Sequence, residues 1–336
     1  MNGVIIIDKP AGWTSHDVVN RMRRILQQRS IGHLGTLDPL ATGVLPLVTG
    51  GLTRLAQFYT TSDKTYEGAI RFGFATNTYD ADGEPVGEAQ SITPGPVNPS
   101  LEHLQKLAAG FQGLIEQVPP PFSAKKIHGV PAYKLARKQK EVVLKPVQVE
   151  IKEFAILAVE GDRARFRARV SSGTYMRSVA HEMGQLQGSG AHLESLRRTA
   201  AAEFSIAQAH TLEEIERQMK GEQQEGQEAA TKPCHSEAAP EPCHSEAAQA
   251  ADEPAVSRHE GIPAFFVHPR QLLPQFPAVT ADDPTAARIR SGRTVNLPDV
   301  SRARQVKVFQ GQSNLIAIAT RVAGTLFHPK IVFSAQ

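Results

Sequence analysis

The chain has 336 residues, 40% of them hydrophobic, which is a length typical of two domains and a composition sufficient for packed cores. No stretch approaches 18 apolar residues and the start of the chain lacks the features of a signal peptide, so we expect a cytoplasmic protein without a membrane span. The formal charge of +3 is uneven, because residues 221–260 carry nine acidic and two basic side chains and leave +10 for the remainder. That balance favours an anionic partner such as nucleic acid.

Strand and helix signals alternate from residue 1 to about residue 220. Helices are expected behind Ser15 and Ser100, which can cap them, and behind the capping-box segment that starts at Thr211. Apolar runs or strict alternation predict strands at residues 4–7, 44–48, 66–74, 142–159 and 164–170. Within the last of these strands, the alternating Arg163, Arg165, Arg167 and Arg169 favour a solvated outer sheet face over a phosphate-binding one.

Residues 221–260 differ in character from the rest of the chain. They contain almost no large apolar residue, so we expect a disordered acidic linker between a domain at 1–220 and another at 261–336. A seven-residue segment at 233–239 recurs at 242–248, and each copy carries one of the two cysteines of the chain, Cys234 and Cys243. Zinc-ligand spacing is absent, so a duplicated linker is the preferred interpretation and neither a metal site nor a disulfide framework is expected.

The final 75 or so residues combine short β-like runs with several arginines. They predict a small β-barrel or sandwich. The arginines suggest an RNA-facing surface, although solvated arginines on loops would give the same pattern. They are Arg288, Arg290, Arg293, Arg302 and Arg304.

The segment Gly32-His33-Leu34-Gly35-Thr36-Leu37-Asp38-Pro39-Leu40-Ala41-Thr42-Gly43 surrounds a single carboxylate with glycine and proline. Glycine permits close backbone approach, and Pro39 keeps Asp38 out of the helical region. A carboxylate fixed on such a loop can act as a nucleophile or base, whereas an arbitrary Asp-Pro pair more often caps a turn.

This segment resembles the active-site motif of TruB-type tRNA pseudouridine synthases. Within that resemblance, leucine at position 40 favours the bacterial stand-alone branch of the family. Further blocks resemble the family in the same order along residues 1–215: residues 8–12, 63–66, 121–126, 173–178 and 196–199. The resemblance implies an α+β fold with a pseudouridine-synthase-like mixed or antiparallel sheet flanked by helices, plus a small PUA-like β domain at the C-terminus. It also implies isomerisation of uridine 55 in the tRNA T loop, with the base flipped out, no cofactor, no obligate protein partner and a monomeric enzyme.

The resemblance assigns catalytic roles to three residues. Asp38 is expected to be the nucleophile or base, by attack on C1′, attack on C6 or removal of a 2′ proton. Arg177 is expected to pair with it, because a neighbouring cation favours the ionised carboxylate. Tyr66 is expected to stack on the base and help take the C5 proton, although a tyrosine on this strand can equally be core packing.

The remaining predicted site residues bind the substrate. Leu196 is expected to cover the target base unless it is plain core, Tyr175 to line the pocket, and His33 to hold the flipped RNA. The basic residues Lys9, Lys64, Lys126 and Arg198 are candidates for contacts to phosphate or to the pocket. No metal-ligand set emerges, and the turn Asp80-Ala81-Asp82-Gly83 lacks the remaining ligands of a calcium loop.

Two other functions fit parts of the sequence. An RNA chaperone would need the basic surface but not Asp38, Tyr66 and Arg177 together. A glycosidase acting on a nucleoside or sugar would usually need a second catalytic carboxylate, for which no motif in the sequence provides a candidate.

Overall fold

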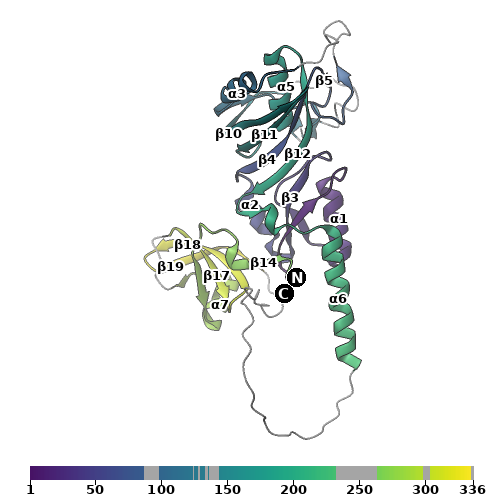
Figure 1. The fold of residues 1–336 in the computed structure, drawn as a ribbon. Helices are drawn as coiled ribbons and strands as arrows, with labels where there is room; N and C mark the ends of the chain where they lie inside the picture. Colours follow the sequence, from purple (N-terminus) through teal and green to yellow (C-terminus); the bar gives the residue numbers. More distant parts are fainter. Residues whose placement is uncertain are drawn as a thin grey trace, which may run out of the picture.

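The computed structural model describes residues 1–86, 98–123, 125–127, 129–132, 135, 144–231, 263–297 and 303–333. A long central sheet forms an elongated body, and a smaller β domain lies beside its lower half (Figure 1). Within the described ranges, no helix has both the length and the apolar character needed to cross a membrane.

The central sheet has ten strands and follows the order β14-β1-β3-β12-β4-β11-β10-β7, with β2 paired to β3 and β13 to β12. All of its pairs are antiparallel except β3 with β12. Its strands are β1 (Gly3–Lys9), β2 (Ile31–His33), β3 (Thr42–Thr49), β4 (Lys64–Phe72), β7 (Gly113–Gln117), β10 (Val147–Glu160), β11 (Arg163–Val170), β12 (Ala191–Ala201), β13 (Phe204–Ser205) and β14 (Phe266–Val267). The predicted α+β fold with a mixed sheet is therefore confirmed. Two small hairpins, β5–β6 (Ala75–Thr76, Pro85–Val86) and β8–β9 (Lys126–Ile127, Val130–Pro131), are separate from the central sheet.

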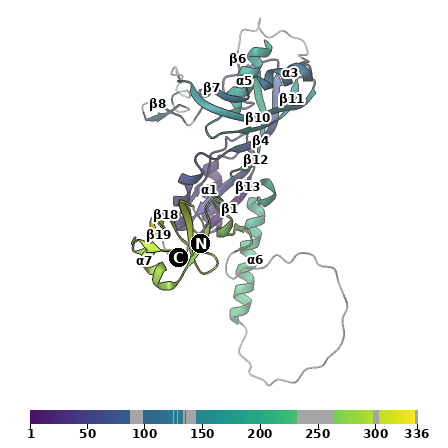
Figure 2. The ribbon, with the colours of Figure 1, turned by 90° about the vertical axis from the view of Figure 1, so that its left-hand side faces the viewer.

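Helices cover the central sheet at both ends. Helices α3 (Leu101–Ala109) and α5 (Met176–Gln187) pack on β10 and β12, while α1 (Ser15–Ile25) packs on β2 and on α6 (Leu212–Thr231) (Figure 2). A short helix α2 (Ala56–Tyr59) follows β3 and one 3-10 turn. Ser100 caps α3 and the Thr211–Glu214 capping box opens α6, as predicted, but the N-cap of α1 is Thr14 rather than Ser15.

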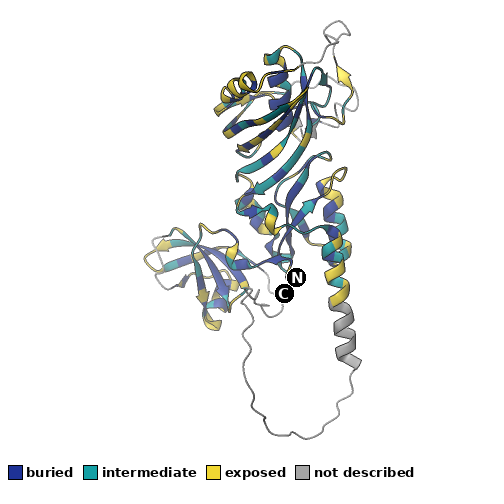
Figure 3. Ribbon diagram, viewed as in Figure 1, coloured by how far each residue is buried: buried dark blue, intermediate teal, exposed yellow. Residues whose placement is uncertain are grey.

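The upper half of the sheet buries only one face. In β11 the residues between the arginines are buried against α3 and α5, and the four arginines are exposed on the other face (Figure 3). Carboxylates on neighbouring elements pair with them, such as Glu194 with Arg163 at 2.8 Å and Asp63 with Arg169 at 2.9 Å. The solvated interpretation of this arginine stripe is therefore confirmed.

Strand β1 is buried on both faces, which explains its unbroken apolar run. Ile5 and Ile7 belong to the core beneath α1 and α6. Val4 and Ile6 face the other way, into a second core shared with the C-terminal domain. A strand covered on both sides needs apolar residues at every position rather than at alternate ones.

The C-terminal domain is a five-stranded sheet of order β15-β17-β18-β19-β16 with one helix, α7. Its elements are β15 (Ala278–Ala281), α7 (Asp283–Arg290), β16 (Val295–Asn296), β17 (Gln305–Gln310), β18 (Asn314–Ala323) and β19 (Leu326–Val332). The β character is as predicted, whereas α7, capped by Asp282, was not anticipated. The same C-terminal segment also supplies β14, which pairs with β1 and extends the central sheet.

The predicted linker begins later than expected. Helix α6 continues to Thr231, so the prediction of disorder is wrong for residues 221–231. Glutamate, glutamine and alanine dominate that stretch, and they form helices well without any apolar face. The rest of the expected linker, residues 232–260, lies outside the described residues together with both cysteines.

A buried polar contact joins the two domains. One carboxylate oxygen of Glu203, in the turn after β12, accepts hydrogen bonds from the hydroxyl of Tyr59 at 2.6 Å and from the backbone N–H of Leu273 at 2.9 Å. Tyr59 and Leu273 are both buried, and burial and the Glu203 charge raise the pKa of the Tyr59 hydroxyl. Nearby, the ammonium of Lys307 donates to the carbonyls of Arg270 and Leu272.

We predict that Glu203→Ala lowers the free energy of unfolding by about 1–3 kcal/mol, because it leaves two buried donors without an acceptor. Chemical denaturation of the full chain measures the change. Glu116→Ala, which truncates an exposed glutamate on β7, is the control and should have little effect. Equal stability of the two variants would contradict the role assigned to Glu203.

Candidate active site

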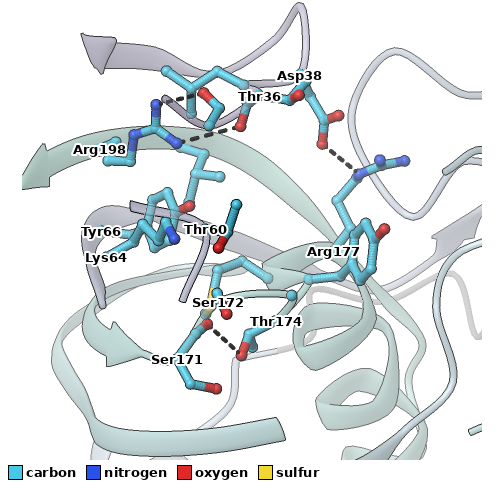
Figure 4. A pocket seen from close by; sticks show the side chains of 16 residues that line it. Thr36, Asp38, Thr60, Lys64, Tyr66, Ser171, Ser172, Thr174, Arg177 and Arg198 are labelled. Atoms are coloured by element: carbon cyan, nitrogen blue, oxygen red, sulfur yellow. Dashed lines mark hydrogen bonds and ion pairs between the residues drawn. The ribbon is translucent and has the colours of Figure 1, made fainter. Parts of the chain in front are cut away.

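A pocket of about 300 Å³ opens where β4, β12 and the β2–β3 loop meet the start of α5 (Figure 4). Seven of the ten predicted site residues line it: Asp38, Lys64, Tyr66, Tyr175, Arg177, Leu196 and Arg198. Segments far apart in the sequence therefore converge on one cavity of a size suited to a small ligand group.

Asp38 lies on the loop between β2 and β3, with its side chain 42% exposed. Its Oδ2 is 2.9 Å from Nε of Arg177, whose side chain is only 5% exposed (Figure 4). The carboxylate of Asp38 is therefore half open and contacts a sheltered cation, so it is oriented while it remains accessible to a substrate.

Backbone carbonyls fix the position of Arg177. One terminal nitrogen donates to the carbonyl of Thr78 and the other to that of Phe122, both at 3.1 Å. The terminal nitrogens are thus occupied, and Nε is presented to the carboxylates.

A second carboxylate, Asp80, approaches the same guanidinium from beneath. Its Oδ2 is 3.5 Å from Nε of Arg177, and its side chain is 8% exposed. Oδ1 accepts a hydrogen bond from the hydroxyl of Thr78 at 2.5 Å and one from the N–H of Asp82 at 3.2 Å. Burial raises the pKa of Asp80, against the lowering effect of the Thr78 hydrogen bond and the Arg177 charge.

From its sequence context, Asp80 was expected only to take part in a turn. The turn exists, but it also brings the carboxylate under Arg177, and no local pattern predicts that long-range contact. Asp80 does not line the pocket, so it can position Arg177 but not touch a base.

Lys9 and Arg198 were predicted as phosphate or pocket contacts, and the structure gives both an internal role. Lys9 is fully buried, and its ammonium donates to the carbonyls of Pro10, Trp13 and Pro39 at 2.8, 2.6 and 3.2 Å. Burial lowers the pKa of Lys9 to about 8, against the raising effect of Asp38. With its donors directed at three carbonyls, this lysine supports the Asp38 loop and is not available to a phosphate.

Arg198 lines the pocket but is 1% exposed. Its Nε donates to the carbonyl of Val44 at 2.7 Å, and its terminal nitrogens donate to those of Thr36 and Gly35 at 3.2 and 3.1 Å (Figure 4). The guanidinium therefore holds the same loop from the opposite side, and a phosphate contact is again not what the structure shows.

Gly43 permits this close packing. A Cβ at this position would lie 2.3 Å from the carbonyl oxygen of Arg198, and the residue has a φ of +96°. Only glycine satisfies both conditions where β3 runs parallel to β12.

The base-binding candidates come from two adjacent strands. Tyr66 on β4 lies opposite Arg198 on β12, and Leu196 lies opposite Gly68. Tyr66 is 8% exposed and belongs to the main core, yet it also lines the pocket, so the two interpretations of this tyrosine hold together. Leu196 packs against the same core and likewise reaches the pocket.

Lys64 and Tyr175 are the remaining predicted residues that line the pocket. Burial, and then the neighbouring charge of Arg198, lowers the pKa of Lys64, whose ammonium donates to the carbonyl of Ser62. Burial, and then the charge of Asp38, raises the pKa of the Tyr175 hydroxyl. Both side chains therefore feel the charges of the site.

Like Lys9, His33 does not line the pocket. His33 ends β2 on the outer stem of the Asp38 loop, where burial and the charge of Arg198 lower its pKa. The backbone of Lys126 belongs to β8, but its side chain lies outside the described part of the structure. Across the described residues, no cluster of three or more histidine, cysteine or carboxylate side chains has the geometry to hold a metal ion.

Comparisons with known proteins agree with this geometry. A family profile described as "TruB family pseudouridylate synthase (N terminal domain)" matches residues 23–176, and one described as "tRNA pseudouridylate synthase B C-terminal domain" matches residues 177–234. The tRNA pseudouridine synthase B of Solibacter usitatus (strain Ellin6076) is 44% identical over 335 residues, which cover 99% of this chain and 100% of that protein. The chain belongs to the TruB family of pseudouridylate synthases.

A second relative and two solved structures extend the comparison. The tRNA pseudouridine synthase B of Opitutus terrae is 45% identical over 217 residues, or 64% of this chain and 88% of that protein. The "Structure of H/ACA RNP bound to a substrate RNA containing 2′-deoxyuridine" contains a chain that aligns with a TM-score of 0.62 at 22% identity, covering 99% of this chain and 85% of its own length. The "Crystal structure of the archaeal box H/ACA sRNP Nop10-Cbf5 complex" gives 0.61 at 22%, with 99% and 86% coverage. At that identity, the likeness supports the TruB-type fold alone.

For this TruB family member we predict that Lys9→Met lowers the free energy of unfolding by about 2–3 kcal/mol, because three partly buried carbonyls lose a charged donor. Thermal or chemical denaturation measures the loss. Lys106→Met, on the exposed side of α3, is the matched control. A Lys9 variant as stable as this control would contradict the buried-support role.

We further predict that Asp80→Asn slows the single-turnover rate of uridine conversion about tenfold, while the Kd for RNA changes less than about twofold. The amide keeps the shape of the side chain but removes the charge that shares Arg177 with Asp38. Filter binding and rapid-quench kinetics separate the two quantities. A loss of RNA affinity with an unchanged rate would show that Asp80 acts on binding and not on Arg177.

Proposed function

We propose that this protein isomerises uridine 55 in the T loop of tRNA to pseudouridine, with Asp38 as the nucleophile or base. The observation that carries the proposal is the 2.9 Å ion pair between Asp38 and Arg177 at the mouth of a pocket that Tyr66 and Leu196 also line. These are the residues that the family resemblance assigned to the reaction, and membership of the family supports the assignment.

The reaction begins with the target uridine leaving its stack, because an enzyme cannot reach the glycosidic bond of a stacked base. The flipped base enters the pocket between the aromatic ring of Tyr66 and the side chain of Leu196. Both side chains are held by the core from behind, so the base meets preformed walls.

Asp38 then starts the cleavage of the N1–C1′ bond. Arg177 orients the carboxylate, because its own position is fixed by the carbonyls of Thr78 and Phe122. The freed uracil turns within the pocket and C5 forms the new bond to C1′. The proton lost from C5 passes to the Tyr66 hydroxyl or to water, and N1 gains a proton, so the overall change is an isomerisation that needs no cofactor.

The rest of the protein serves RNA binding in this proposal. Arg288, Arg290, Arg293 and Arg304 are exposed on the C-terminal domain and suit contacts to the phosphates of the tRNA arm, whereas Arg302 lies outside the described residues. The enzyme acts in the cytoplasm as a monomer, without an obligate protein partner.

The position of Asp80, the second carboxylate near Arg177, disfavours a glycosidase. Asp80 is the residue that would have to serve as a partner acid, but it is buried under Arg177 and does not line the pocket. The chemistry available to a substrate therefore rests on one carboxylate, where most glycosidases use two.

We predict that Asp38→Asn abolishes turnover while the Kd for tRNA stays within about threefold of wild type, because the amide preserves the shape of the side chain and lacks the nucleophilic charge. Tritium release from tRNA carrying 5-tritiated uridine measures turnover. Asp162→Asn makes the same chemical change at a turn outside the pocket and serves as the control.

Three results would discriminate among the functions. Normal turnover by Asp38→Asn would refute its role. Tight tRNA binding without tritium release by the wild-type protein would favour an RNA chaperone. Tritium release by the wild-type protein that persists when uridine 55 of the tRNA is replaced by cytidine would place the reaction at another uridine.

A further inference from the structure

Trp13 is an exposed aromatic residue with no assigned role. It is the sole tryptophan of the sequence and lies between β1 and α1, with 37% of its surface accessible. An exposed indole is a large apolar surface with one polar group, and such side chains are enriched at binding interfaces.

The backbone around Trp13 is bonded to both sides of the catalytic loop. The N–H of Gly12 donates to the carbonyl of Pro39 at 2.9 Å. The hydroxyl of Ser15 accepts from the N–H of Leu37 at 2.8 Å and donates to its carbonyl at 3.1 Å. Leu37 and Pro39, the two loop residues in these bonds, flank Asp38. Gly12 and Ser15, their partners, flank the segment that contains Trp13.

The buried Lys9 completes this connection. Its ammonium donates to the carbonyl of Trp13 at 2.6 Å and to that of Pro39 at 3.2 Å, so one cation bridges the two segments. Trp13 is thus fixed to the loop that carries Asp38. Trp13 does not line the pocket, but its backbone is one bridging lysine away from the residue that follows Asp38.

Two histidines lie on the segments that border the loop. His33, half-buried, ends β2 just before it, and His16 is exposed in the first turn of α1, where its charge lowers the pKa of His33. Flat rings, the surfaces on which unpaired RNA bases stack, therefore occur on the segments that border the loop.

We infer that Trp13 stacks on a base of the substrate RNA that neighbours the flipped uridine, outside the catalytic pocket. This inference rests on the proposed function. When one nucleotide leaves its stack, the bases beside it lose a stacking partner, and a rigid indole next to the catalytic loop replaces it.

A structural role for Trp13 makes a different prediction. Thr14 is the N-cap of α1, so Trp13 and the buried Val18 occupy the positions of a hydrophobic staple. A staple stabilises the start of a helix through any large apolar side chain, whereas base stacking requires an aromatic ring.

The substitutions Trp13→Phe and Trp13→Leu separate these roles, with Leu157→Ala as the control at an exposed apolar residue of β10. The Kd for a T-arm hairpin RNA, the single-turnover rate at saturating RNA and the thermal midpoint are measured for each variant. We expect Trp13→Leu to weaken RNA binding about tenfold, with Trp13→Phe and Leu157→Ala within about threefold of wild type. The saturated rate and the thermal midpoint of Trp13→Leu should stay near the wild-type values.

Because the chain has one tryptophan, its fluorescence reports directly on this contact. In an Asp38→Asn background, which prevents turnover, saturation with the hairpin should quench the indole emission, and Trp13→Phe should abolish the signal. Unquenched emission, or a Trp13→Leu variant that binds RNA as tightly as wild type, would overturn the inference and leave a staple or a protein contact as the explanation. A wild-type protein that neither binds nor isomerises the RNA would refute the proposed function itself, before any variant is compared.

Discussion

The ion pair between Asp38 and Arg177 is the interaction around which the structure is arranged. It joins a loop near the start of the chain to the first turn of α5, and Arg177 is almost inaccessible to water. A buried guanidinium is costly unless it is paired with opposite charge, and here two carboxylates lie within 3.5 Å of Nε while two carbonyls accept hydrogen bonds from the terminal nitrogens. Removal of any of these groups changes where the positive charge lies relative to Asp38.

Two further buried cations serve the same loop. Lys9 and Arg198 donate to main-chain carbonyls on opposite sides of Asp38, so the loop is held by charged donors instead of by a regular sheet ladder. Hydrogen bonds from charged donors are stronger than neutral ones, which suits a segment too irregular to form its own secondary structure. The Asp38 loop is therefore held in place by side chains that donate to its own backbone carbonyls.

Much of the fold could be predicted from the sequence. The continuous apolar run at Val4–Ile7 predicted β1, because a strand buried on both faces is apolar at every position. The alternation that starts at Tyr66 predicted β4, because a strand buried on one face is apolar at every second position. The convergence of Asp38, Tyr66 and Arg177 was predicted by family resemblance and not by periodicity. Sequence alone cannot distinguish a buried cation from a solvated one, so the internal hydrogen bonds of Lys9 and Arg198 were not predicted, and the contact of Asp80 with Arg177 depends on tertiary structure.

Strand β14 follows the acidic segment at residues 221–260 and pairs with β1. Before the insertion, the backbone at His210 bonds to β1, and after it Phe266 and Val267 pair with the same strand. Both ends of the intervening segment are therefore anchored on one strand, whatever its length. For a connection closed in this way, doubling the length costs only about 0.6 kcal/mol of chain entropy. Duplication of a heptapeptide there therefore changes the free energy of folding little, which explains how the repeat at 233–248 can exist.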